Sequence, residues 1–345
     1  MLWLCLNEQD EAVPNFKRKI CMLGVSILVV VLVWGGAQRP AAADVQITYR
    51  LKWLENMSTV GDLFAAEKGF FRDEGLDVTI KPGGPERDAI RELELGYAHF
   101  GVASADQVIR ALAKGSPVVV VAQLFQVNPL QWIYRRDRLS IARLDDLKGK
   151  TIGVTFGKND EMILRAMLVQ AGIRENQVRL YGVRLDYSPF YRGLVDLWPV
   201  YINTQAVEIG GRLRAAGETV GFLNPADYGV RFVANSVVTS PALANDRPEI
   251  VKRFVRALLK GWRQAVDPAN NDPAMDVVQR FDRDSTRQVL QQQLVLTRTL
   301  VKPSPESVIG AIDTPAWAQT ERIMLDHHQI PEPVHVVENL KPVEE

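Results

Sequence analysis

The residues that are best placed to form a functional site have side chains suited to binding a ligand rather than to catalysis. Ser104 and Ala105 follow a short apolar segment, residues 100–103, and begin a segment with helical character. Where a strand runs directly into a helix, the unpaired N–H groups of the first helical turn lie at the sheet edge where open α/β sheets place ligands. The sequence therefore predicts that Ser104 and Ala105 contact a polar or anionic group, with an ordinary strand-to-helix turn as the alternative.

Aromatic side chains supply a second kind of binding chemistry. Trp53 follows the first predicted strand, residues 45–51, and can stack on a planar ring, although a tryptophan that covers the hinge or the core is the alternative. Tyr187 and Tyr201 belong to an aromatic-rich segment, in which a tyrosine either packs in the core or offers its hydroxyl to a ligand. Asp196 could accept a hydrogen bond from an amino group or cap a turn. We expect all four residues in a binding site.

Five loop positions complete the predicted site. Asn56 and Ser58 lie in the same loop as Trp53 and could bind a ligand or cap the loop. Gly84 follows the second strand and would let the backbone approach a ligand closely, or form a plain turn. Phe156 and Gly157 follow the first strand of the second half, which is the mirror position across a cleft.

Several classes of function are disfavoured by composition. Basic and acidic residues both number 41, which argues against a nucleic-acid-binding protein. The two cysteines, Cys5 and Cys21, both precede residue 44, so the remainder offers no thiolate nucleophile or disulfide. His327 and His328 are adjacent and do not converge on one ion. No Walker loop, dinucleotide fingerprint or Ser-His-Asp pattern is present. We expect no metal, no cofactor and no catalytic residue.

Residues 1–43 have the pattern of an export signal. A basic cluster at residues 16–19 precedes an apolar run, residues 20–37, and Ala41–Ala43 fit a small-residue cleavage site. The apolar run is close to the length of a membrane span, so an uncleaved anchor is the alternative. Either interpretation places the remainder outside the cytoplasm, in the periplasm.

Strands alternate with helices along the rest of the chain, which predicts βαβ units and largely parallel sheets. We expect residues 44–135 to form the first part of lobe 1, residues 136–235 an inserted lobe 2, and residues 236–345 a mostly helical return to lobe 1. Two extended crossings would join the lobes, so that they can close around a ligand by hinge motion.

The sequence also resembles a known family, the THI5/NMT1-like proteins. Residues 51–84 are similar to the opening of these proteins, and residues 93–102 to their "L..G..DFG" segment. Residues 145–154 resemble the entry to the second lobe. Residues 193–203 resemble the "G.vDa…yiN" segment, and residues 309–317 the C-terminal segment of the pyrimidine-precursor branch. These stretches occur in the family's order and spacing and together cover most of the chain after the targeting segment.

The resemblance implies an α/β, bilobal type II periplasmic-binding-protein fold with a hinged cleft. It also implies a monomeric solute-binding protein that captures a small-molecule ligand and delivers it to an ABC permease in the inner membrane. The resemblance also implies that Trp53 contacts a ring of the ligand. The aromatic candidates favour a thiamine pyrimidine precursor, such as a formylaminopyrimidine.

Three alternatives stay open. A nitrate-, sulfonate- or taurine-binding protein would need a basic residue in the cleft; Arg87 is a candidate, whereas Lys158 is expected to be solvated. A pyrimidine-synthase-like enzyme is disfavoured, because the cysteine-rich motif of that branch is absent. An anchored ligand-sensing domain would fit an uncleaved N-terminal segment.

Overall fold

The computed structural model describes residues 44–84 and 86–343. The targeting segment expected over residues 1–43 lies outside the described residues. Within the described ranges, no helix combines the length and the apolar character that a membrane span requires.

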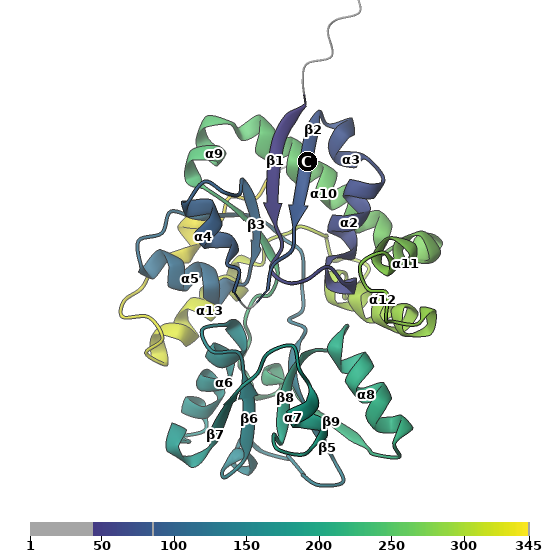
Figure 1. The fold of residues 1–345 in the computed structure, drawn as a ribbon. Helices are drawn as coiled ribbons and strands as arrows, with labels where there is room; N and C mark the ends of the chain where they lie inside the picture. Colours follow the sequence, from purple (N-terminus) through teal and green to yellow (C-terminus); the bar gives the residue numbers. More distant parts are fainter. Residues whose placement is uncertain (1–43, 85, 344–345) are drawn as a thin grey trace, which may run out of the picture. The chain divides into compact units, whose positions relative to one another are not determined.

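The first sheet has five strands in the order β2-β1-β3-β10-β4 (Figure 1). Strands β1, β2 and β3 are parallel, and β10 is antiparallel to both of its neighbours. All five residues of β4 are buried, as the run of β-branched residues predicts. The strands are β1 (Val45–Arg50), β2 (Leu76–Lys81), β3 (Phe100–Ala103), β4 (Val119–Gln123) and β10 (Ser236–Thr239).

The second sheet repeats this arrangement in the order β7-β6-β8-β5-β9. Its strands are β5 (Leu130–Arg135), β6 (Thr151–Val154), β7 (Arg179–Gly182), β8 (Leu197–Tyr201) and β9 (Val220–Leu223). Residues 130–135, which the sequence analysis assigned to the first lobe, lie here because β5 pairs antiparallel with β8 and β9. Strand β9 was not predicted.

Helices accompany both sheets (Figure 1). Those between strands of the first sheet are α2 (Val60–Glu67), α3 (Phe70–Asp73), α4 (Ala89–Glu94) and α5 (Ala105–Ala113). Those of the second sheet are α6 (Asn159–Gln170), α7 (Ser188–Tyr191) and α8 (Gln205–Ala215). The C-terminal part is helical as expected: α9 (Pro241–Asp246), α10 (Pro248–Ala265), α11 (Asn271–Gln279), α12 (Arg287–Val301) and α13 (Thr314–Asp326). Helices α2 and α3 are separate elements, because Gly69 between them has a left-handed backbone (φ 74°).

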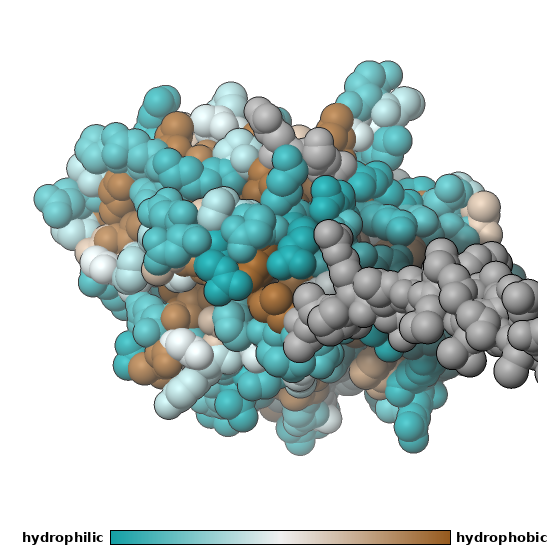
Figure 2. Space-filling model, turned by 90° about the horizontal axis from the view of Figure 1, so that it is seen from above, coloured by the Kyte–Doolittle hydropathy of each residue, from teal (hydrophilic) through white to brown (hydrophobic). Residues whose placement is uncertain are grey.

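Buried aromatic rings hold α10 against the first sheet. Phe254 of α10 stacks on Phe100 of β3 at 3.8 Å between ring centroids, and it also contacts Tyr49 and Phe71. In the second sheet the buried ring of Trp198 contacts Phe190 and Tyr187. The space-filling view from above shows a largely hydrophilic face with hydrophobic residues in small groups (Figure 2).

Two crossings join the sheets: residues 124–129, and residues 224–235, which include the 3-10 helix η4 (Pro225–Tyr228). Asn128 connects them: its Nδ2 donates to the carbonyl oxygen of Phe232 at 2.9 Å, and its Oδ1 accepts from the N–H of Leu130. The crossings therefore form one hydrogen-bonded unit between the two lobes.

Candidate ligand-binding cleft

A cavity lies between the two lobes and is lined by residues from both. It holds about 1100 Å³ of empty space, part of it continuous with solvent. Most of the lining residues follow strands or open helices, where side chains and unpaired backbone groups are available to a ligand. The first lobe contributes Lys52, Trp53, Asn56, Ser58, Thr59, Asp62, Gly84, Arg87 and Gln107, and the second contributes Thr155, Lys158, Asp160, Arg184, Tyr187, Trp198 and Tyr201, among others.

The predicted loop after β1 lines the cavity. Trp53 is half-buried there, and Gly84, in a conformation unusual for other residues (φ 150°), lies beside it along the wall. Asn56 also caps its own loop, since its Oδ1 accepts from the N–H of Ser58. The Ser58 hydroxyl contacts the side chain of Asn203, whose Nδ2 donates to it at 3.0 Å. The capping role considered for this loop is thus present, and the same residues face the cavity.

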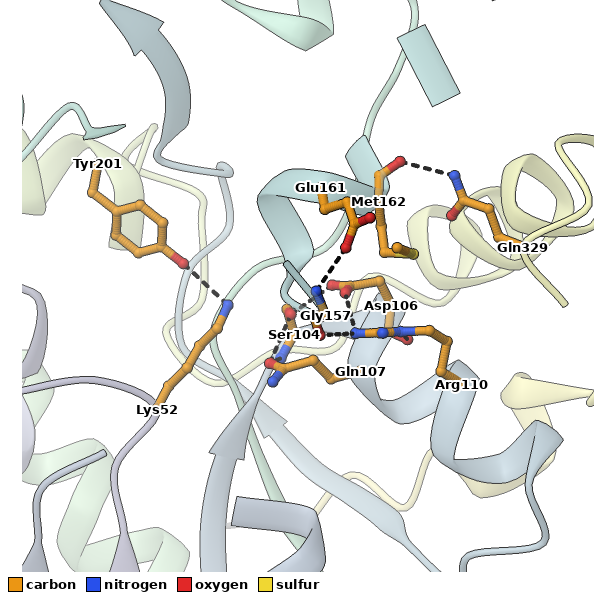
Figure 3. Close-up of polar contacts among 10 residues, drawn as sticks. All are labelled: Lys52, Ser104, Asp106, Gln107, Arg110, Gly157, Glu161, Met162, Tyr201 and Gln329. Atoms are coloured by element: carbon orange, nitrogen blue, oxygen red, sulfur yellow. Dashed lines mark hydrogen bonds and ion pairs between the residues drawn. The ribbon is translucent and has the colours of Figure 1, made fainter. Parts of the chain in front are cut away.

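The two predicted tyrosines line the opposite wall. Tyr201 ends β8, and its hydroxyl accepts a hydrogen bond from Nζ of Lys52 at 3.1 Å, across the cleft (Figure 3). Tyr187 packs edge-on against Trp198, and burial raises the pKa of its hydroxyl, so it stays protonated. Trp53, Tyr187 and Tyr201 therefore border one space from two lobes.

Ser104 and Ala105 do not line the cavity. Ser104 is 1 % exposed, and its hydroxyl donates to Asp106 while its N–H donates to the side chain of Gln107. The N–H of Ala105 donates to the carbonyl oxygen of Val233 in the second crossing. The first turn of α5 is therefore occupied by the protein itself, and Gln107 reaches the cavity in place of Ser104.

Three predicted residues of the second lobe also lie away from the cavity wall. Phe156 is exposed, and Gly157 donates its N–H to Glu161 and accepts from Arg110 of α5 at 3.2 Å. Asp196 precedes β8 and accepts from the N–H of Thr151 at the start of β6, which is the opposite end of the sheet from the cavity.

Four basic side chains line the cavity: Lys52, Arg87, Lys158 and Arg184. The sequence analysis considered Arg87 and expected Lys158 in solvent. Lys158 lies at the cavity because it precedes α6 at the carboxyl end of β6, where its Nζ approaches the carbonyl oxygen of Arg87 at 3.5 Å. Arg87 and Arg184 are exposed at the rim, so the mouth of the cleft is basic.

Two buried carboxyl groups face the same cavity, one from each lobe. Asp62 lies in the first turn of α2, and burial raises its pKa to about 7 despite a 2.6 Å hydrogen bond from Tyr49. Burial also raises the pKa of Asp160 to about 6, although it accepts a hydrogen bond from the N–H of Thr155. Within the described residues, no group of three or more His, Cys, Asp or Glu residues is arranged to hold a metal ion.

Direct contacts between the lobes surround the cavity (Figure 3). Besides the Lys52–Tyr201 bond, Arg110 reaches the carbonyl oxygen of Gly157, and Gln329 donates to the carbonyl oxygen of Met162 at 2.8 Å. Buried contacts join the lobes as well: Asn203, just after β8, donates to Ser58 and to Thr297 of α12. One hydrophobic cluster also contains Val108 of α5 and Leu164 of α6.

A family model described as NMT1/THI5 like matches residues 56–271. The riboflavin-binding protein RibY of Chloroflexus aurantiacus is 28% identical over 93% of this chain and 95% of its own length. The formylaminopyrimidine-binding protein of Halalkalibacterium halodurans is 27% identical over 90% of this chain and 95% of its own. A 4-amino-5-hydroxymethyl-2-methylpyrimidine phosphate synthase of Legionella pneumophila is 27% identical over 63% of this chain and 68% of its own.

Solved structures share the architecture. The alkanesulfonate-binding protein SsuA from Xanthomonas axonopodis pv. citri, bound to MOPS, aligns with a TM-score of 0.66 and 16% identity, over 88% of this chain and 99% of its own. The bilobal periplasmic-binding-protein fold expected from the sequence is confirmed.

Proposed function

The chain belongs to the NMT1/THI5-like family, and on that basis we propose that it is an extracytoplasmic solute-binding protein of an ABC importer. A small solute enters the open cleft, the lobes close over it, and the closed form presents it to a permease in the inner membrane. Relatives that are similar over nine-tenths of the chain are named as binding proteins, which supports this role.

The class of ligand is inferred from the aromatic wall of the cavity. Trp53, Tyr187 and Tyr201 border one space with acceptor groups at its base and basic side chains at its mouth. Planar rings gain from stacking and edge contacts in such a space, about 0.5–1.5 kcal/mol per aromatic pair beyond area burial. We propose a planar heteroaromatic solute, with an aminopyrimidine precursor of thiamine as the favoured ligand.

Riboflavin is the second candidate. RibY, named as a riboflavin-binding protein, is similar along nearly the whole chain. Because the mouth of the cleft is basic, a sulfonate or nitrate remains an alternative ligand. The carboxyl groups of Asp62 and Asp160 would, however, repel a small anion held deep in the cleft.

A catalytic role is not proposed. The relative named as a synthase matches a shorter part of the chain, and no cysteine occurs after residue 43. The cavity wall also lacks histidine and cysteine among its described residues, so binding explains the site with no reacting group.

A thermal-shift screen of the purified protein tests the proposal. The ligands are a formylaminopyrimidine, riboflavin, taurine, an alkanesulfonate and nitrate. A ligand at a hundred times its Kd stabilises a protein of this size by about 2.7 kcal/mol, which raises Tm by about 4 °C. We expect a shift with one heteroaromatic compound that is lost in Trp53→Ala and retained in Tyr97→Ala, an exposed tyrosine outside the cleft. Shifts with anions alone would contradict the ligand class.

A further inference from the structure

Asp62 is a buried carboxyl at the cavity wall that has no cationic partner. It is 1 % exposed, and its Oδ1 accepts the hydroxyl hydrogen of Tyr49. The indole of Trp262 also favours its charged form, although the indole N–H makes no hydrogen bond of normal geometry. In the part of the chain that the structure describes, no hydrogen bond of normal geometry is made to Oδ2 of Asp62, although the backbone N–H of Asp62 and the Trp262 indole both favour the charged carboxyl. One carboxylate oxygen is therefore available on the cavity side.

The charged groups around Asp62 are engaged with other residues. Lys52, in the loop before η1 (Met57–Thr59), lines the same cavity but donates to Tyr201. Helix η1 itself contributes only uncharged side chains. Three basic residues on or beside α10 and α11, the helices packed on α2, pair with acidic residues elsewhere: Arg256 with Glu74, Lys260 with Asp73, and Arg280, at the end of α11, with Glu67. No nearby charge contributes to the pKa of Asp62; desolvation dominates it.

A carboxyl in this position costs stability, because burying a charge without a counter-charge is unfavourable. Thr59, not Asp62, is the N-cap residue of α2, although the backbone N–H of Asp62 also favours the charged carboxyl. A neutral amide at this position could still accept the hydrogen bond from Tyr49. The position of Asp62 at the cavity wall points to a role in binding.

Asn235 supplies a second acceptor at the same edge of the first sheet. Its side chain is 5 % exposed and lines the cavity, and its Oδ1 has no hydrogen-bond partner among the described residues. Asn235 precedes β10, whose start lies beside the end of β3, close to the end of β1. Asp62 and Asn235 thus offer two acceptors to a ligand in the cleft.

We propose that Asp62 is a specificity-determining residue whose free carboxylate oxygen accepts an N–H of the ligand, with Asn235 as the second acceptor. The inference rests on the proposed function and narrows its ligand class to planar heterocycles that carry a ring N–H or an amino group. A ligand with acceptors alone would leave both groups buried and unpaired, so the cleft rejects it.

Calorimetric titration of wild type and Asp62→Asn tests the assignment, with an aminopyrimidine and riboflavin as probes at pH 8.0 and pH 5.5. At pH 8.0 the carboxylate is charged, and we expect Asp62→Asn to raise Kd about tenfold or more. At pH 5.5 Asp62 is protonated in the free protein, and we expect the ratio of the two Kd values to fall several-fold. Asp160, the other carboxyl at the cavity with a raised pKa, is common to both proteins.

A second variant keeps the test informative if Asp62→Asn folds poorly. Tyr49→Phe retains the carboxyl and removes its hydrogen-bond donor, so the pH at which wild-type affinity is half lost should move upward. Equal Kd ratios for Asp62→Asn at both pH values, or an unmoved midpoint in Tyr49→Phe, would overturn the role of Asp62 and leave the proposed function intact. A wild-type protein that binds neither probe would overturn the inference together with the heteroaromatic ligand class.

Discussion

At the scale of single residues, Asp62 links stability to pH. Its pKa is about 7 in the folded protein, against roughly 3.9 in an unfolded chain, so the folded state binds more protons between these values. Stability therefore falls as pH rises from about 4 to about 7 and stays low above that range. Asp62→Asn should unfold with a free energy about 2–4 kcal/mol higher than wild type at pH 8, and similar at pH 4.

Urea unfolding at the two pH values measures this difference. Asp160, whose pKa is also raised, is present in both proteins and cancels from the comparison. Asp246→Asn, an exposed carboxyl of α9, serves as the control and should change nothing at either pH. A constant offset between Asp62→Asn and wild type across this pH range would mean that Asp62 is not the titrating group.

Some site residues could be predicted from local sequence features alone. Trp53 was predicted because it follows a strand, and Tyr187 and Tyr201 because they lie in an aromatic-rich segment; all three reach the cavity. Ser104 and Ala105 occupy an equivalent position, but the second crossing covers them through the Val233 carbonyl, a contact between segments far apart in sequence. Asp62 looks like an ordinary polar residue of a helix in the sequence, and only the packing of α10 shows that it is buried.

At the scale of elements, the contact between α2 and α10 sets the shape of the cleft base. These helices approach closely because glycines face the contact: a Cβ at Gly61 would lie 2.1 Å from the ring of Trp262. Gly61→Ala should therefore lower the free energy of unfolding by about 1–3 kcal/mol through overpacking. Chemical denaturation measures the change.

A matched glycine in another helix provides the control. Gly211 of α8 has open space where a Cβ would lie, so Gly211→Ala should stabilise the protein by about 0.5–1 kcal/mol. If Gly61→Ala matched wild type in stability, α10 could move aside without cost, and the close approach would not be a constraint.

Elements with strong local patterns were predicted well. The strand expected over residues 45–51 is β1, the apolar segment before Ser104 is β3, and the part after residue 236 is mostly helical as expected. Strand β9 was missed because its four residues, Val220–Leu223, include a glycine and show no sustained alternation. The assignment of β5 to the first lobe failed because strand pairing across the crossing depends on tertiary contacts, which no local pattern carries.

At the scale of the whole molecule, the two lobes are joined by the crossings, by polar contacts and by a hydrophobic cluster with residues from both lobes. A single hydrogen bond contributes about 0.5–1.5 kcal/mol, so one polar contact changes the closure equilibrium only slightly. A ligand shifts the equilibrium by its preference for the closed form. Breaking one contact should therefore cost ligand affinity even when the altered residue does not line the cavity.

Arg110 allows this to be measured, because its guanidinium reaches Gly157 across the lobes while the residue lies outside the cavity wall. We expect Arg110→Ala to raise the ligand Kd about two- to fivefold, and to increase the radius of gyration of the ligand-free protein in X-ray scattering. Arg91→Ala is the control, since Arg91 pairs with Glu94 within one helix and should alter neither quantity. An Arg110→Ala protein with wild-type Kd and wild-type radius would show that this contact does not stabilise closure, and the closed form would then depend on the ligand and the crossings.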